Sequence, residues 1–442
     1  MKYQYESQQV AYPFFVAAML LFAGQIVFGL IIGAQYMWPD FLFPAIPFHI
    51  ARMIHINLLV VWLIFGFMGS TYYLIPEEVE GELYSVKLAI TQFWLFLAGG
   101  VTAVVGYLFR WHDGREFLEQ PFIIKVAIVI VVLMFIYNIS MTMLKGKKRT
   151  STSIVLLIGF IGMALLYLFA FFKPDNMIVD KYYWWLVVHL WVEGVWELIM
   201  AAILSFLLIK LTGAEREVAE KWLYIIVGLT FITGIIGTGH HYYWIGAPEF
   251  WQTWGAWFSV FEVLPFAAMI AFSFDMLSKK TRSHQNKAAI LWTVGTTIMS
   301  FVGAGVWGFL HTMPQINYYT HGTQITASHG HMAFFGAYVM IVIAMISYAV
   351  PNLRNQESLN QKAEVIAFWT MVISMLFMGL SLTGAGIVQV YLQRILGMPF
   401  MEAQEHIALF YGLRFFFGIT FTLGLGIYLY DFFSSAKSRT KG

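Results

Sequence analysis

The 442-residue sequence contains no cysteine, and this absence removes several kinds of site at once. Disulfide bonds, thiolate-bound zinc and the usual iron–sulfur clusters all require cysteine sulfur. A haem attached covalently through a C-x-x-C-H motif is excluded for the same reason. Any metal or haem iron held by this chain must therefore be bound through other side chains.

Charged residues are also scarce. They make up 11% of the sequence and hydrophobic residues 60%, whereas an ordinary soluble domain carries roughly 25% charged residues. The formal net charge of +2 is too small to indicate a nucleic-acid partner. The composition therefore predicts an integral membrane protein whose surroundings are lipid.

Twelve apolar stretches are long enough to cross a bilayer, which takes about 20 residues. The connections between them are short and no internal repeat is evident, so we expect one all-α membrane domain over residues 1–442. The N-terminus lacks the short apolar core and cleavage site of a signal peptide, and its first stretch is expected to stay as a helix. The expected spans are 12–37, 50–75, 87–110, 121–144, 152–173, 181–210, 220–246, 251–278, 288–313, 325–351, 363–390 and 408–433.

The basic residues predict the orientation, because cytoplasmic loops are enriched in Lys and Arg. With twelve spans, both termini and the even-numbered loops share one side. That side, which we therefore expect to be cytoplasmic, holds 18 of the 26 basic residues: Lys2, Lys87, Lys145, Lys147, Lys148, Arg149, Lys210, Arg216, Lys221, Lys279, Lys280, Arg282, Lys287, Arg354, Lys362, Lys437, Arg439 and Lys441.

Six histidines fall at one depth, in the outer half of the predicted bilayer. Ionisable side chains in lipid are costly and are functional candidates. A lone histidine is more often a hydrogen-bonding group between helices. The combination of H-H, H-x-H and H-x-x-x-E at one depth instead favours ligands of redox metals or haem. The six are His55, His189, His240, His241, His329 and His331.

The spacing of these groups indicates what each could bind. On a regular helix His189, Glu193 and Glu197 share one face, and imidazole with carboxylate suits a first-row metal, iron in particular. His240 and His241 are adjacent and diverge on a regular helix, but near a helix end they can converge on one ion.

The H-x-H pair has a different geometry. His329 and His331 point to nearly opposite sides of one helix, so that helix could serve two haems, with His55 as a second axial ligand for one of them. Lys125 and Arg414 lie near span ends and are expected to snorkel. The remaining histidines are expected to be solvated or interfacial: His49, His112, His284, His311, His321 and His406.

This arrangement of spans and histidines resembles the haem-copper oxidase superfamily over essentially the whole chain. Common oxygen-reducing members carry a tyrosine four residues after the histidine of the sixth span, where this chain has Glu193. A second oxidase branch carries its tyrosine earlier on the seventh span, but residues 225–239 contain none. The segments HLWVEGVWE, GTGHHYYWIG and SVFEVLPF together resemble the large, catalytic subunits of cytochrome c-dependent nitric oxide reductases.

The resemblance implies a bundle like subunit I of the oxidases and a set of cofactor ligands. His55 and His331 would bind a low-spin haem b, and His329 a high-spin haem b. A non-haem iron would be held by His189, Glu193, His240 and His241, with Glu197 and Glu262 delivering protons. In the outer loop GREFLEQP, Glu116 would bind Ca²⁺ with Glu119 close by, and Arg52 and Arg115 would contact haem propionates or the loop.

The resemblance also implies an activity and a partner. Two molecules of nitric oxide would be reduced to nitrous oxide and water, as in denitrification, with electrons from a membrane-anchored c-type cytochrome subunit. The chain would lie in the bacterial inner membrane with both termini in the cytoplasm. Two alternatives stay open: a terminal oxygen reductase of the same superfamily, and a twelve-helix secondary transporter that uses the histidines and carboxylates as a proton relay.

Overall fold

The computed structural model describes residues 3–434, and these residues form helices and no β-strand. Twelve helical stretches are long and apolar enough to cross a membrane, which confirms the all-α, twelve-span fold expected from the sequence. Four basic residues used for the orientation lie outside the described residues: Lys2, Lys437, Arg439 and Lys441.

Eight spans consist mainly of one α-helix each. They are α1 (Ala11–Met37), α2 (Phe48–Val79), α3 (Val86–Leu108), α4 (Phe122–Lys145), α5 (Ser151–Tyr167), α8 (Arg216–Gly237), α16 (Gln361–Gln389) and α18 (Ala408–Ser434). The other four spans are each divided in two: α6 (Met177–Leu190) and α7 (Trp196–Thr212), α9 (Phe250–Val260) and α10 (Val263–Ser278), α11 (Lys287–Ser300) and α12 (Trp307–Thr312), α14 (Gln324–Phe334) and α15 (Met340–Leu353). Two short helices lie in loops, α13 (Pro314–Thr320) and α17 (Phe400–Glu405).

Three of the divided spans are joined by π-helical segments, in which one turn is wider than in an α-helix. These are Trp191–Val195, Phe301–Val306 and Phe335–Val339. A fourth such segment, Val390–Ile395, follows α16. Isolated π-helical turns within α-helices are frequent at functional sites. The positions of these interruptions therefore direct attention to the helices around them.

Polar residues begin many of the helices. Side-chain oxygens that accept backbone N–H groups of the first turn satisfy donors that the helix itself leaves free. Capping of this kind starts α3, α5, α6, α11, α14 and α16, through Ser85, Thr150, Asn176, Asn286, Thr323 and Asn360.

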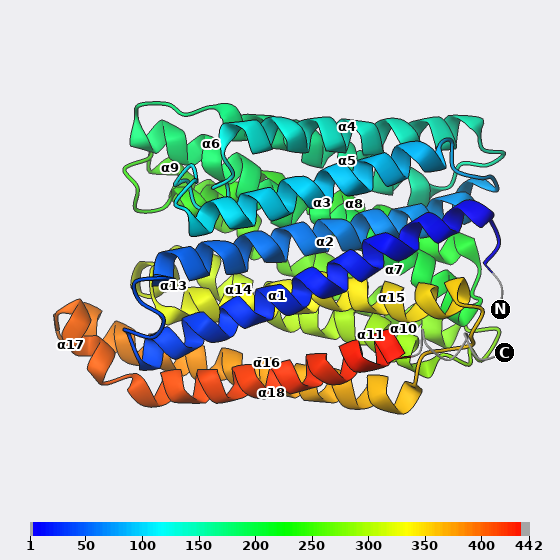
Figure 1. The fold of residues 1–442 in the computed structure, drawn as a ribbon. Coiled ribbons are helices and arrows are strands. Elements are labelled where there is room, and N and C mark those ends of the chain that lie inside the picture. The colour runs from blue at the N-terminus through cyan, green and yellow to red at the C-terminus, as the bar shows by residue number, and fades with distance from the viewer. Residues whose placement is uncertain (1–2, 435–442) are drawn as a thin grey trace.

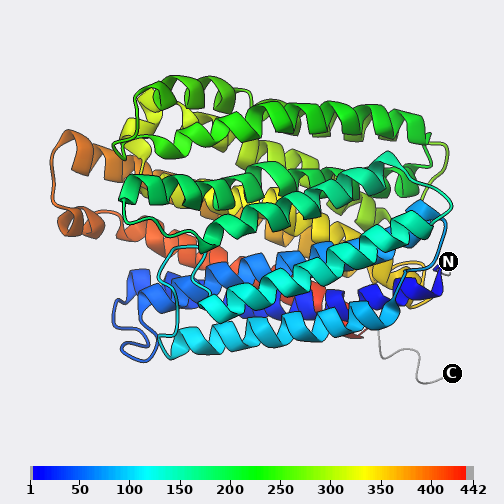
Figure 2. The ribbon, with the colours of Figure 1, turned by 90° about the horizontal axis from the view of Figure 1, so that it is seen from above.

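The spans differ in how deeply they lie within the bundle. The span Gln324–Leu353 is the most central, with 94% of its most apolar stretch buried, followed by Met177–Thr212 with 72% and Phe48–Val79 with 67%. These three spans carry four of the six histidines expected to act as ligands, His55, His189, His329 and His331. The helices run side by side, and the described ends of the chain lie at one end of the bundle with α13 and α17 at the other (Figures 1 and 2).

Candidate metal centre and cofactor cavity

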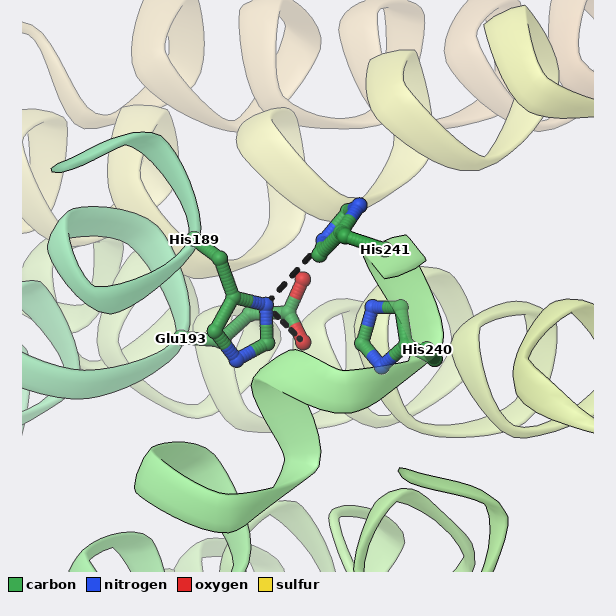
Figure 3. A group of neighbouring side chains, drawn as sticks. All are labelled: His189, Glu193, His240 and His241. Atoms are coloured by element: carbon green, nitrogen blue, oxygen red, sulfur yellow. Dashed lines mark hydrogen bonds and ion pairs between the residues drawn. The ribbon is translucent and has the colours of Figure 1, made fainter. Parts of the chain in front are cut away.

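Four side chains converge on one point in the interior of the bundle. Each of His189, Glu193, His240 and His241 offers a ligand atom, and these atoms all lie within 4.8 Å of one another. Figure 3 shows the three imidazoles and the carboxylate facing a common space. The grouping brings together all four residues that the resemblance implied for the non-haem iron.

The distances within the cluster suit one ion. His241 Nε2 lies 3.1 Å from His189 Nδ1, which is 3.6 Å from Glu193 Oε2 (Figure 3). Nitrogen ligands that are each about 2 Å from a shared metal lie about 3 Å apart. The side chains present therefore fit a bound first-row metal ion.

Two of the imidazoles are oriented by hydrogen bonds through their other ring nitrogen. His189 Nε2 lies 2.8 Å from the carbonyl oxygen of Gly234. His240 Nδ1 lies 2.7 Å from Ser259 Oγ, and that hydroxyl donates to the Gly237 carbonyl at 3.0 Å. Metal-ligating histidines almost always make such a second contact, which fixes the tautomer. In both residues the free nitrogen is the one available to the cluster.

Departures from regular helix bring the four side chains together. Glu193 lies in the π-helical segment Trp191–Val195 with φ −104° and ψ 20°. His240 and His241 lie in the tight 3-10 segment Thr238–Tyr242, where adjacent residues can face one ion as the sequence suggested. A close approach of α9 also requires glycine, because a Cβ on Gly255 would lie 2.7 Å from the backbone nitrogen of His240.

A second histidine pair faces across the bundle between α2 and α14. The ring centroids of His55 and His331 are 6.3 Å apart and the rings are inclined by 30°. Their Nδ1 atoms lie 2.8 Å and 2.7 Å from the carbonyl oxygens of Gln25 and Ala327. Two iron–imidazole bonds of about 2 Å each, together with the ring widths, span about this separation. The pair therefore fits two axial ligands of one haem.

His329 lies on the other side of α14. Its Nδ1 atom is 3.0 Å from the carbonyl oxygen of Gly303 in the π-helical segment Phe301–Val306. This direction differs from that of His331, as the H-x-H spacing predicted. His311, expected to be solvated or interfacial, instead lies with its ring centroid 6.2 Å from that of His329 and contacts two threonine hydroxyls at 3.1 Å.

One cavity of about 730 Å³ connects these groups. Its lining includes five of the six histidines together with Glu193: His55, His189, His241, His329 and His331. Apolar side chains form most of the remaining wall. A large apolar cavity with a few convergent ligands is the usual form of a cofactor site, and here it links the facing histidine pair with the metal cluster.

The two acidic residues expected to deliver protons also line this cavity. Glu197 is buried, and its Oε2 atom accepts a hydrogen bond from Thr230 Oγ1 at 2.9 Å. Glu262 lies at the break between α9 and α10, and its buried Oε1 atom has no hydrogen-bond partner in the described part of the chain. The carboxyl group of Glu262 therefore lies beside that of Glu193, with one oxygen facing no donor among the described residues.

The outer-loop residues named by the resemblance make ion pairs and hydrogen bonds of their own. Glu116 forms an ion pair with Arg52, which lines the cavity. Glu119 is buried and accepts a hydrogen bond from Asn57 Nδ2 at 3.0 Å, and burial raises the pKa of its carboxyl group. Arg115 donates to Asp180 at 2.7 Å. Arg52 thus lies at the cavity wall, whereas the two Nη atoms of Arg115 donate to Asp180 and to nearby carbonyl oxygens.

Three residues make contacts that the sequence pattern did not indicate. Arg414, expected to snorkel, lines the cavity, with its guanidinium carbon 4.7 Å from the ring centroid of Tyr36 and a buried Nη1 atom without a partner among the described residues. Lys125, also expected to snorkel, is buried and pairs with Asp113. The Tyr338 hydroxyl donates to the carbonyl oxygen of Val192, directly beside Glu193. From the sequence alone, a basic residue near the end of a span cannot be assigned to the lipid-facing side or to the interior of the bundle.

Comparisons with known proteins agree with this geometry. Residues 9–420 match the family described as cytochrome c and quinol oxidase polypeptide I. A nitric oxide reductase subunit of Stutzerimonas stutzeri is 56% identical over 451 residues, covering 97% of this chain and 95% of the relative. The Cbb3-type cytochrome c oxidase subunit CcoN1 of the same organism is 22% identical, covering 91% and 89%.

A solved structure of a heme-copper terminal oxidase dimer has the same fold. It matches with a TM-score of 0.77 at 14% identity, covering 97% of this chain and 84% of the solved chain. Sequence and fold therefore give the same assignment: the chain belongs to the cytochrome c and quinol oxidase polypeptide I family and is a close relative of the nitric oxide reductase subunit of Stutzerimonas stutzeri.

Proposed function

We propose that this chain is the catalytic subunit of a cytochrome c-dependent nitric oxide reductase, which reduces two molecules of nitric oxide to nitrous oxide and water. The observation that carries the proposal is the convergence of three histidines with a carboxylate, Glu193, at the position where common oxygen-reducing relatives have tyrosine. The identity of 56% with a nitric oxide reductase subunit, against 22% with an oxidase subunit, supports the same choice.

The cofactors follow from the donor sets. A non-haem iron would be held by His189, Glu193, His240 and His241, because imidazole nitrogen with carboxylate oxygen suits iron. A low-spin haem b would be held by His55 and His331, and a high-spin haem b by His329. When bound, the high-spin haem and the non-haem iron would supply two neighbouring coordination sites and the electrons for joining two nitric oxide molecules.

The protein contributes position, exclusion of water and protons. The apolar wall of the cavity keeps bulk water from the reacting molecules, and holding two reactants together removes much of the entropic cost of their encounter. The unpartnered Oε1 atom of Glu262 can carry a proton to the cluster, and the Glu197 carboxyl, held by Thr230, can replace it. We assign both residues to proton delivery on this basis.

The outer end of the bundle would receive electrons and hold calcium. Because the histidines lie towards that end and the chain has no cysteine for a covalent haem, a separate membrane-anchored c-type cytochrome subunit would dock there. Glu116 would contribute a carboxylate oxygen to a Ca²⁺ ion, a ligand type that calcium prefers. From the positive-inside bias we infer that both termini lie in the cytoplasm, with the chain in the inner membrane of a bacterium.

The test is an anaerobic assay on the purified complex with a reduced c-type cytochrome. We expect nitrous oxide to form from nitric oxide, and metal analysis to give about three iron atoms for every two haems, without copper. Copper in stoichiometric amount with about one iron per haem would instead indicate an oxygen reductase. A protein without a Soret band would indicate the transporter alternative.

A further inference from the structure

One imidazole of the metal cluster is held differently from the others. The ring of His241 stacks on the indole of Trp185, with centroids 3.8 Å apart and planes inclined by 11°. By contrast, the ring of His189 meets those of His240 and His241 nearly edge-on, at 77° and 70° and centroid distances of 5.0 Å. Trp185 therefore covers one whole face of a single ligand ring.

The contact with Trp185 orients the one ligand ring that has no second hydrogen bond. His189 and His240 are each oriented through a second ring nitrogen, by Gly234 and Ser259. His241 uses Nε2 towards His189, and its other ring nitrogen has no hydrogen-bond partner within residues 3–434. No second hydrogen bond therefore fixes the rotation of the His241 ring about its bond to Cβ. The flat indole surface restricts that rotation.

The same helix face supplies the stacking surface and a ligand. Trp185 lies four residues before His189 on α6, and residues at this spacing are neighbours on a helix. Behind it, the Trp184 ring is nearly parallel to that of Trp185 at 5.9 Å and 6°, and Lys181 Nζ lies 3.3 Å from the centroid of Trp184.

We propose that Trp185 is a positioning residue of the metal centre, which fixes the plane of His241 by ring stacking in place of a hydrogen bond. The proposal rests on the proposed function in one respect, that His241 ligates the metal. A hydrogen bond from the second nitrogen raises the basicity of a ligating histidine. His241 has no such partner among the described residues, so the stacking contact is what fixes its ring orientation, on which its bond to the metal depends.

The experiment compares three variants of the purified complex. Trp185→Leu removes the stacking surface and Trp185→Phe keeps an aromatic ring. Trp184→Leu is the matched control, because it makes the same change one residue away without touching His241. The readouts are iron per haem, loss of non-haem iron to a chelator, the Mössbauer spectrum of that iron, and the haem optical spectrum as a measure of folding.

We expect Trp185→Leu to lose non-haem iron to the chelator about tenfold more readily, the lower part of the range for loss of an outer-shell partner. Its Mössbauer parameters should change while both haem bands stay intact. Trp185→Phe should restore most of the iron retention, and Trp184→Leu should behave as the wild type. If Trp185 only supported the packing of α6, its replacement would not change the Mössbauer spectrum of the iron while the haem bands stay the same.

The opposite results separate the two proposals. If the wild type retains its third iron and Trp185→Leu has the same iron retention and spectrum, Trp185 does not position His241. Equal losses in Trp185→Leu and Trp184→Leu would attribute the effect to general packing of α6 and would also overturn the proposal. A wild type with no iron beyond its haems would overturn the proposed metal centre itself.

Discussion

The facing pair His55 and His331 and the four-ligand metal cluster are built in contrasting ways. Each member of the pair lies on a regular α-helical stretch and is oriented by one backbone carbonyl. The cluster instead takes its ligands from the end of α6, from a π-helical segment and from a 3-10 segment. Its supporting contacts come from a backbone carbonyl, a serine hydroxyl and a tryptophan ring.

The contrast shows what each task demands of a helix. Two ligands can face each other from two straight helices, since each helix has to present only one side chain. The four ligands around one point include two adjacent residues, His240 and His241, and a regular helix directs adjacent residues apart. Local departures from regular geometry supply the convergence. The cluster should therefore respond more sharply than the pair to small changes in its surroundings.

The largest expected effect comes from Glu193→Gln. The variant replaces a carboxylate ligand with a neutral amide, so iron occupancy should fall and nitric oxide reduction should drop by more than the roughly 10- to 100-fold that loss of an outer-shell partner costs. Both haems should remain bound. Metal analysis, the optical spectrum and the anaerobic assay measure these three quantities.

Glu197→Gln is the matched control for this change. The residue lies one turn further along and is bonded to Thr230 rather than to the cluster, so the iron should be retained while activity falls about 100-fold through slower proton delivery. Full iron and full activity in Glu193→Gln would remove the carboxylate from the ligand set and with it the main distinction from the oxidases.

His331→Ala tests the facing pair His55 and His331. Because His331 faces His55 and His329 faces Gly303, the variant should lose the low-spin haem signal and keep the high-spin haem and the non-haem iron. His329→Ala should give the reverse pattern. Electron paramagnetic resonance and optical spectra distinguish the two haems. The loss of the low-spin signal in His329→Ala alone would mean that the two assignments must be exchanged.

A smaller effect is expected from Tyr338→Phe. The hydroxyl donates to the carbonyl oxygen of Val192, which lies in the π-helical segment directly before Glu193. Loss of this hydrogen bond costs about 1 kcal/mol, so iron retention against a chelator should fall less than tenfold. The haem pair should be unaffected. An unchanged iron affinity would show that the segment keeps its shape without the tyrosine.

The smallest effect is expected outside both sites. Burial alone would raise the pKa of Asp113, but hydrogen bonds and charges from Lys125 and Lys173 outweigh it and lower the pKa. The ion pairs therefore stabilise the fold above the unfolded-state pKa of about 3.9, and this contribution is lost as the pH falls through the folded-state value.

Asp113→Asn should accordingly lower the stability at neutral pH by about 1 kcal/mol without changing either cofactor site. Thermal unfolding of the purified complex over a range of pH measures this effect. The difference between the variant and the wild type should shrink as the pH falls below about 4. A constant difference at all pH values would mean that the ion pairs do not cause it.

Much of the fold was predictable because each membrane span is marked by a long apolar run, and all twelve were confirmed. The ligand candidates were predictable because histidine and glutamate at membrane depth are costly and usually serve a function. The contacts that support the ligands were not predictable from the sequence. Tyr338 and Arg414 lie within apolar or aromatic-rich stretches where nothing distinguishes a residue beside the cofactor cavity from one that faces lipid. The spacing that places Trp185 beside His189 does not show that its ring covers His241. Which side a residue faces depends on the helix interruptions, and no residue pattern marked them.

The interruption at Trp191–Val195 has a further consequence for the whole span that contains it. A wider turn holds about one residue more than an α-helical turn, and one residue corresponds to a rotation of about 100°. The residues of α7 are therefore turned relative to those of α6, and Glu197 does not join His189 and Glu193 in the cluster as the spacing on a regular helix would direct.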